Sequence, residues 1–127
     1  MAKSLRPTDG ELAILRVLWE GGAGTVREVQ TRLGGEAGYT TVLKLLQIMT
    51  EKGLVIRNET NRTHIYSPAH PAAQTQRQLV KDLVERAFGG SSANLVLQAL
   101  AAKRATPEEL AEIRRLLDEH EQKEDRP

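Results

Sequence analysis

The chain has 127 residues, enough for one hydrophobic core or for a small domain with an appendage. Its hydrophobic content of 39% and charged content of 28% are those of a soluble globular protein, and its net charge of +1 neither requires nor excludes a nucleic-acid partner. The absence of cysteine excludes disulfides, thiolate metal sites and cysteine nucleophiles. No stretch resembles a membrane span or a signal region, so we expect a cytoplasmic protein that does not insert into membranes.

Two short helices are predicted at the start of the chain, each opened by a capping box. In this motif a threonine and a glutamate three residues later exchange hydrogen bonds with each other's backbone N–H groups. The first box is Thr8 with Glu11, the second is Thr25 with Glu28, and a pair of glycines closes each helix. The side chains predicted to be buried recur at helical spacing: Leu12, Leu15, Leu18 and Trp19 in the first helix, and Val26, Val29 and Leu33 in the second.

The stretch GYTTVLKLLQIMTEKGLV, residues 38–55, predicts a third amphipathic helix followed by a strand. Gly53 lies where a left-handed C-cap is expected. The predicted core face consists of residues at i, i+3, i+4 and i+7, namely Val42, Leu45, Leu46 and Met49.

The opposite face of this helix carries hydroxyls, an amide and a cation. A recognition helix in the DNA major groove needs short polar groups near its N-terminal end and a cation that reaches a guanine edge or a phosphate. A merely solvated face is the alternative, and Glu51 on the same face favours it slightly. If the face does bind DNA, the contacting residues are expected to be Tyr39, Thr40, Thr41, Lys44 and Gln47.

Two β-branched stretches, LVIRNE and RTHIYS, predict a β-hairpin with a turn around residues 60–61. Arg57 and Arg62 flank this turn, and Thr63 with His64 adds further hydrogen-bond donors. Such a hairpin can lie along the DNA backbone as a wing that grips phosphates. Three short helices followed by a hairpin is the order of a winged helix-turn-helix domain, although a helix–hairpin domain with no DNA role would share it.

Pro68 and Pro71 end the hairpin and divide the chain into a winged-helix DNA-binding domain, residues 1–70, and a helical region, residues 71–127. The helical region contains a third capping box at 106–109 and ends in a polar tail that we expect to fray. Its thin amphipathic helices cannot bury their apolar faces well against one another, so a homodimer related by a two-fold axis is expected, with folding back onto the first domain as the alternative. The residues expected in the dimer interface are Leu79, Leu83, Leu95, Leu100, Leu110, Ile113 and Leu117.

Enzyme motifs are absent from the sequence. GAGTVR at residues 22–27 lacks the third glycine of a dinucleotide site, and GGSSA at 89–93 is not a nucleophile elbow. The three histidines are too scattered for a zinc site. We therefore expect no catalytic residue, no metal and no cofactor.

Four segments, ELAILRVLW, TVREVQTRL, YTTVLKLLQIMTEKGLV and RTHIYSP, resemble in order the motifs of the penicillinase and methicillin-resistance repressors (the BlaI/MecI/CopY group). The similarity continues through NLVLQAL and TPEELAEIRRLLDEH. It implies a mainly α fold with a small β-hairpin wing, in which an N-terminal winged helix precedes a C-terminal helical dimerisation region. It also implies repression of transcription by a homodimer on a palindromic operator.

The resemblance also implies roles for particular residues. Thr41 and Lys44 fall on base-reading positions of the recognition helix, Arg62 falls on the wing arginine, and Tyr66 and Pro68 fall on the residues that close the hairpin. The wing turn has asparagine at position 61 where the family often has glycine, and asparagine tolerates left-handed backbone angles nearly as well. Because the chain has no cysteine, the copper-sensing sites of one branch of the family are excluded.

Relatives in this family are cut within the C-terminal helical region, which implies a membrane sensor metallopeptidase as a further partner. The aligned bond is Gln98–Ala99, which departs from the Asn-Phe pair of the family. Two other functions agree with the sequence pattern. One is a winged-helix regulator that responds to a small molecule, and the other is a winged-helix module that binds proteins.

Overall fold

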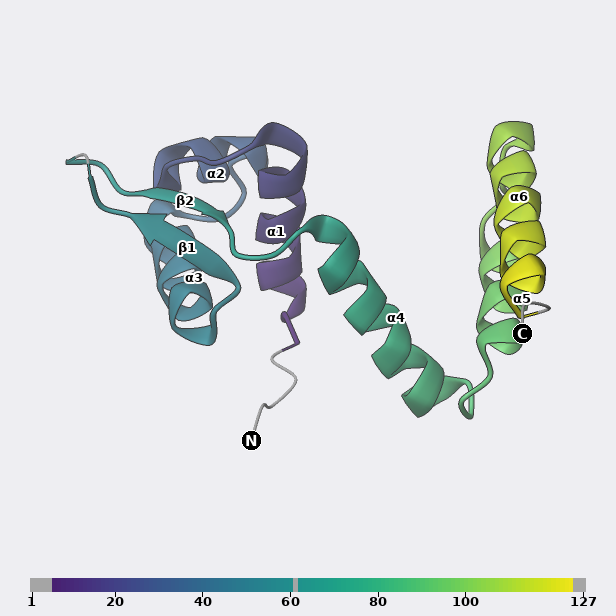
Figure 1. Cartoon of the computed structure of the whole chain (residues 1–127). Coiled ribbons are helices and arrows are strands. Elements are labelled where there is room, and N and C mark those ends of the chain that lie inside the picture. Colours follow the sequence, from purple (N-terminus) through teal and green to yellow (C-terminus); the bar gives the residue numbers. More distant parts are fainter. Residues whose placement is uncertain (1–5, 61, 125–127) are drawn as a thin grey trace. The chain divides into compact units, whose positions relative to one another are not determined.

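Three helices and an antiparallel hairpin, followed by three further helices, make up the computed structural model, which describes residues 6–60 and 62–124 (Figure 1). The fold is therefore mainly α with a small β-hairpin, as predicted. None of the helices within the described residues is both long and apolar enough to span a bilayer. In chain order the elements are α1 (Asp9–Gly21), α2 (Val26–Arg32), α3 (Tyr39–Lys52), β1 (Val55–Asn58), β2 (Ile65–Pro68), α4 (Ala72–Ala87), α5 (Ser92–Ala102) and α6 (Pro107–Glu124).

Local hydrogen bonds start and stop the N-terminal helices where the sequence predicts. The Thr8–Glu11 box begins α1 and the Thr25–Glu28 box begins α2, with both reciprocal bonds present in each. Gly53 ends α3 with φ 79° and ψ 18°, a left-handed conformation that glycine adopts without the steric cost of a Cβ atom. The N-terminus of α3 differs, because Gly38 is its N-cap and provides no side-chain hydrogen bond.

The hairpin pairs β1 with β2 in antiparallel register, with Arg57 opposite Tyr66. Its loop is longer than the predicted turn, because β2 begins at Ile65 and residues 62–64 belong to the loop. Position 61, where the sequence suggested a left-handed residue, lies outside the described residues. The backbone of Gly24 extends the sheet by one bridge, donating to the Tyr66 carbonyl at 3.0 Å and accepting from the Tyr66 N–H at 2.8 Å. This bridge joins the α1–α2 connection to the base of the hairpin.

The core lies between α1, α2, α3 and the hairpin and is almost entirely aliphatic. Two predictions on α1 were wrong: Leu12 and Trp19 are only half-buried, while Ile14 is fully buried. The reason is that the buried side of α1 packs against α2, α3 and the hairpin, whereas Leu12 and Trp19 line an open cavity together with Leu79 of α4. Leu33 and Leu45 are likewise half-buried at the edge of the core. Its buried residues are Ile14, Leu15, Leu18, Val26, Val29, Val42, Leu46, Met49, Leu54, Val55 and Tyr66.

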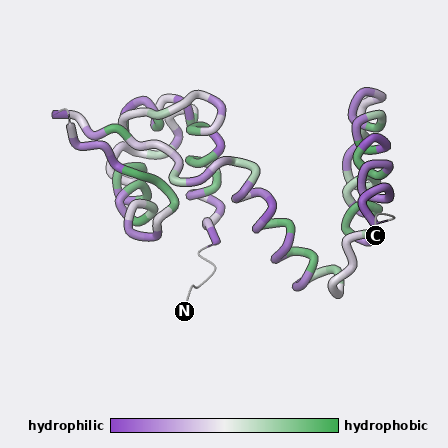
Figure 2. Tube along the Cα trace, in the orientation of Figure 1, coloured by the Kyte–Doolittle hydropathy of each residue, from purple (hydrophilic) through white to green (hydrophobic). Residues whose placement is uncertain are grey.

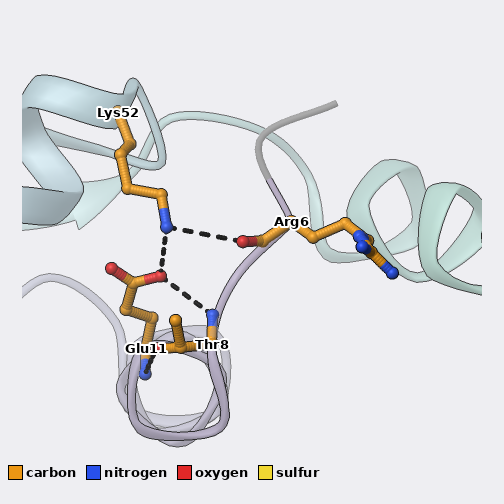
Figure 3. Close-up of polar contacts among 4 residues, drawn as sticks. All are labelled: Arg6, Thr8, Glu11 and Lys52. Carbon is orange, nitrogen blue, oxygen red and sulfur yellow. Dashed lines mark hydrogen bonds and ion pairs between the residues drawn. The ribbon is translucent and has the colours of Figure 1, made fainter. Parts of the chain in front are cut away.

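One buried ion pair connects the start of α1 to the end of α3 (Figure 3). Glu11 is only 2% exposed, and its Oε1 accepts from Lys52 Nζ at 2.6 Å and from the Thr8 backbone N–H at 2.9 Å. Lys52 Nζ also donates to the carbonyl oxygen of Arg6 at 3.4 Å. Burial raises the pKa of Glu11, but the hydrogen bonds from Lys52 and Thr8 together with the Lys52 charge outweigh it and lower that pKa. The Glu11 carboxylate therefore caps α1 and also joins it to the end of α3.

The chain divides into two compact units, Met1–Val80 and Lys81–Pro127. Hydrophobic and hydrophilic residues alternate along α4, which passes from one unit to the other (Figure 2). The helix α6 begins at a third capping box, between Thr106 and Glu109, and continues to Glu124. The tail that was expected to fray is therefore helical from residue 121 to 124, with a guanidinium–carboxylate network of Arg115, Glu112 and Glu119 one turn earlier.

Candidate nucleic-acid interface

The exposed face of α3 carries the residues that the sequence assigned to DNA. Thr40, Thr41, Lys44 and Gln47 are all exposed, whereas Val42, Leu46 and Met49 on the opposite side are fully buried. The preceding helix fixes the approach to α3, because Gln30 Nε2 donates to the carbonyl of Ala37 at 3.2 Å. A rigidly mounted helix with short polar groups at its N-terminal end has the form that major-groove reading requires.

The hairpin supplies the cations that were predicted for a wing, but one of them is engaged. Arg62 and Thr63 are exposed in the loop. Arg57 Nη2 lies 2.9 Å from Glu59 Oε1, and His64 Nε2 lies 3.8 Å from the same oxygen. The Glu59 carboxylate thus neutralises part of the positive charge that the wing would offer to DNA.

This pairing predicts a gain of affinity when the carboxylate is removed. Glu59→Gln should strengthen binding to any duplex by up to about fivefold, since an exposed ion pair is worth about 0.2–1 kcal/mol and Arg57 becomes available to a phosphate. Fluorescence anisotropy with a labelled duplex measures the change, and Glu20→Gln on α1 serves as a control that removes the same charge away from the hairpin. Weaker binding by Glu59→Gln would instead mean that Glu59 holds Arg57 in its binding position.

An open cavity of about 360 Å³ brings part of the predicted site together with residues that the sequence did not single out. Tyr39, Arg62 and Thr63, all assigned to DNA from the sequence, line it, whereas the other five assigned residues do not. The additional residues come from the start of α2, from α3 and from the hairpin, and the guanidinium of Arg27 lies over the Tyr39 ring, 5.0 Å from its centroid. In the sequence Arg27 is only a polar residue in the first turn of a short helix, so no local signal identifies it. The lining residues are Thr25, Val26, Arg27, Tyr39, Leu43, Arg62, Thr63, His64 and Tyr66.

Tyr66 is buried, unlike the exposed cations of the wing. Its side chain is 1% exposed and belongs to the core, and its backbone makes both bonds of the bridge to Gly24. It therefore anchors the base of the hairpin against the α1–α2 connection, and Pro68 is the last residue of the same strand.

The residues expected to form a dimer interface lie on helices that have no buried residue in the single chain. Leu79, Leu95, Leu110 and Ile113 are half-buried, while Leu83, Leu100 and Leu117 are exposed. Val80, Val96, Leu97 and Leu116, which the sequence did not assign, are exposed as well. Gln98 and Ala99 are both exposed within α5.

A helix-turn-helix with a polar recognition face, followed by a β-hairpin with a cationic loop, defines a winged helix-turn-helix protein. The chain belongs to the penicillinase repressor family, whose family model matches residues 7–119. The resemblance seen in the sequence is thereby confirmed. The family consists of repressors and not of enzymes, in agreement with the expectation that the chain has no catalytic residues.

The relatives are similar over nearly the whole chain. The "Transcriptional regulator BlaI" of Mycobacterium tuberculosis (strain CDC 1551 / Oshkosh) is 32% identical over 124 residues, which cover 95% of this chain and 89% of the relative. The "Penicillinase repressor" of Bacillus licheniformis is 23% identical over 122 residues, which cover 94% of this chain and 95% of the relative. A solution structure of Bacillus licheniformis BlaI, in monomeric form with the blaP half-operator, aligns with 57% of this chain and 92% of that chain at 23% identity and a TM-score of 0.48.

Proposed function

We propose that this protein is a sequence-specific transcriptional repressor that binds a palindromic operator as a homodimer. The observation that carries the proposal is the exposed polar face of α3 beside a cationic wing, in a chain that belongs to a repressor family. Such a protein acts by occupying an operator, so it needs neither a catalytic group nor a cofactor. Its DNA affinity should fall steeply and log-linearly with salt, because phosphate contacts release counterions, whereas a protein-binding module would show no such slope.

In this proposal α3 enters the major groove and the wing follows the backbone. Lys44 reaches a guanine edge or a phosphate, Gln47 has the amide that pairs with adenine, and the hydroxyls of Thr40 and Thr41 contact bases or backbone near the helix start. Tyr39, Arg57, Arg62 and Thr63 hold phosphates, which supplies affinity and register without reading the sequence.

Substitutions in the helix and in the wing should therefore have different effects. Lys44→Ala or Thr41→Val should weaken operator binding by roughly 1–3 kcal/mol and reduce the preference among operator variants. Arg62→Ala should weaken binding to all sequences alike and lower the salt slope by roughly 1. Titrations of operator variants at several salt concentrations measure both effects. If Arg62→Ala changed the sequence preference and Lys44→Ala did not, the two roles would be reversed.

The exposed apolar residues on the helices of residues 71–127 are evidence for the proposed dimer. Within the described residues, none of α4, α5 and α6 buries a side chain in the single chain, yet each carries large apolar residues. A second copy covers such faces through a two-fold interface in which the same patch contacts itself. The two recognition helices would then lie about 34–36 Å apart, or at a multiple of this distance, matching one turn of DNA. Residues 1–70 bind DNA and residues 71–127 dimerise in this division of labour.

Repression would end when the dimer is cut. We place the cut at the Gln98–Ala99 bond, which is exposed on α5, a helix that also carries Val96 and Leu100. Cutting this helix leaves two pieces that are each too short to stay helical alone, so the apolar contacts of the dimer are lost. The protease would be a membrane sensor metallopeptidase.

Co-expression with a membrane metallopeptidase encoded beside the gene tests the cut. After the inducer is added, mass spectrometry should find fragments 1–98 and 99–127, and a peptidase without its catalytic glutamate should leave the chain intact. An intact repressor that nevertheless leaves its operator would contradict proteolytic relief.

A further inference from the structure

We propose that the cavity between α2, α3 and the wing, lined by Arg27, Tyr39 and Arg62, binds one phosphate group of the DNA backbone, and that Arg27 is a further DNA-contacting residue. The proposal rests on the proposed function and specifies how the domain holds its duplex. It concerns a side chain on α2, the helix that precedes the recognition helix.

The chemistry of the cavity suits an anion. Its lining contains two guanidinium groups, the His64 imidazole and four hydroxyl-bearing residues, and no acidic side chain. Two carboxylates that are close in sequence to lining residues have partners of their own: Glu28 accepts from the Thr25 backbone N–H at 2.9 Å, and Glu59 lies 2.9 Å from Arg57 and 3.8 Å from His64. Arginine forms bidentate, charge-assisted hydrogen bonds with phosphate. A volume of about 360 Å³ leaves room for a phosphate group and several waters, since each water takes about 30 Å³.

Arg27 is held ready for this contact. Its guanidinium lies over the Tyr39 ring at 5.0 Å, and within the described residues it forms no ion pair. A guanidinium over an aromatic ring is attracted to the ring and can still donate N–H hydrogen bonds to an anion. The helix that carries it is fixed by the Thr25–Glu28 box and by two buried valines. The ring therefore holds the Arg27 guanidinium beside the cavity before a phosphate binds.

Because of where the cavity lies, the proposed phosphate contact would help to orient the protein on the duplex. Its lining comes from α2, from the start of α3 and from the wing loop, so one phosphate would be held by three elements at once. Phosphate contacts fix the register and orientation of a protein on a duplex. Arg27 and Arg62 together would set the depth at which α3 enters the groove while the wing lies on the backbone.

The full-length protein and a labelled 30-base-pair duplex of mixed sequence test the proposal, with affinity measured by fluorescence anisotropy from about 50 to 200 mM KCl. Arg27→Ala should lower the salt slope by about 0.9, the value for one lost phosphate contact. Arg27→Lys, which keeps the charge, should keep the slope. Arg16→Ala on α1 is the matched control, since it removes an exposed arginine that does not line the cavity.

A double-mutant cycle tests the stacking. Tyr39→Ala should weaken binding in the natural chain but much less in the Arg27→Ala background, because the ring acts in part by holding Arg27. If Arg62→Ala lowers the salt slope but Arg27→Ala does not, the inference is overturned while the proposed function stands. The same conclusion follows if Arg27→Lys lowers the salt slope as much as Arg27→Ala does. A natural chain without salt-dependent DNA binding would overturn both.

Discussion

Replacing Lys52 by methionine should destabilise the N-terminal unit by about 3 kcal/mol at neutral pH. The substitution keeps most of the side-chain volume but leaves the Glu11 carboxylate, whose side chain is 3% exposed, without its counter-charge. Removing one partner of a buried ion pair costs about 3–5 kcal/mol, and the lower value applies here because the Lys52 side chain keeps 23% exposure. Urea denaturation followed by circular dichroism measures the loss.

The pH dependence of this loss identifies its cause. In the natural chain the pKa of Glu11 is lowered, so its stabilising contribution is present above the ordinary glutamate value of about 4.3 and is lost as pH falls through the lower folded value. In Lys52→Met, burial still raises the Glu11 pKa while the Lys52 hydrogen bond and charge are gone, so this pKa rises. The difference between the two proteins should therefore be largest at neutral pH, begin to shrink as pH falls through the higher Glu11 pKa of the variant, and be lost below the lowered pKa of the natural chain.

The exposed pair of Arg16 and Glu20 offers a matched control for this experiment. These two side chains lie 3.8 Å apart on α1, and both are well exposed. Arg16→Met should change stability by less than about 0.5 kcal/mol, as exposed pairs contribute little. Equal losses in Lys52→Met and Arg16→Met would show that the Glu11–Lys52 pair does not join α1 to α3.

Leu97→Glu should convert the protein into a monomer and lower its operator affinity by about 100-fold or more. Leu97 is 65% exposed on α5, so a charge there costs the isolated chain little. In the proposed dimer the same position is covered by a partner copy, and burying an unpaired carboxylate is strongly unfavourable. A dimer holds two linked half-sites, whose combined affinity can exceed that of one half-site by about 10²–10⁴.

Sedimentation velocity and anisotropy on the DNA upstream of the gene measure the two effects of this substitution. Asn94→Glu is the control, since it adds the same charge to the same helix on an exposed polar position in the first turn, where a carboxylate is favourable. A Leu97→Glu protein that remains dimeric with full affinity would place the interface on other residues.

The elements that depend on neighbours along the chain follow from the sequence. The capping boxes at Thr8 and Thr25 link residues three apart, so the residues that start α1 and α2 are determined locally. The buried stripe of α3 and the left-handed Gly53 are visible for the same reason. These local signals, in their order, predict three helices and a hairpin and place Thr40, Thr41, Lys44 and Gln47 on the exposed face of α3.

Tertiary contacts decided the rest, because they join residues that no local pattern relates. Which leucines of α1 are buried depends on how that helix packs against α2, α3 and the hairpin, and Leu12 instead lines a cavity shared with α4. From the sequence, Glu11 is predicted only to cap a helix. In the fold, Lys52 at the end of α3 lies beside it and forms an ion pair. Arg27 becomes part of the candidate interface only when α2 sets it over Tyr39 and beside the wing. Such contacts form only when helices and strands that are far apart in the sequence pack around one core, so no local stretch of sequence predicts them.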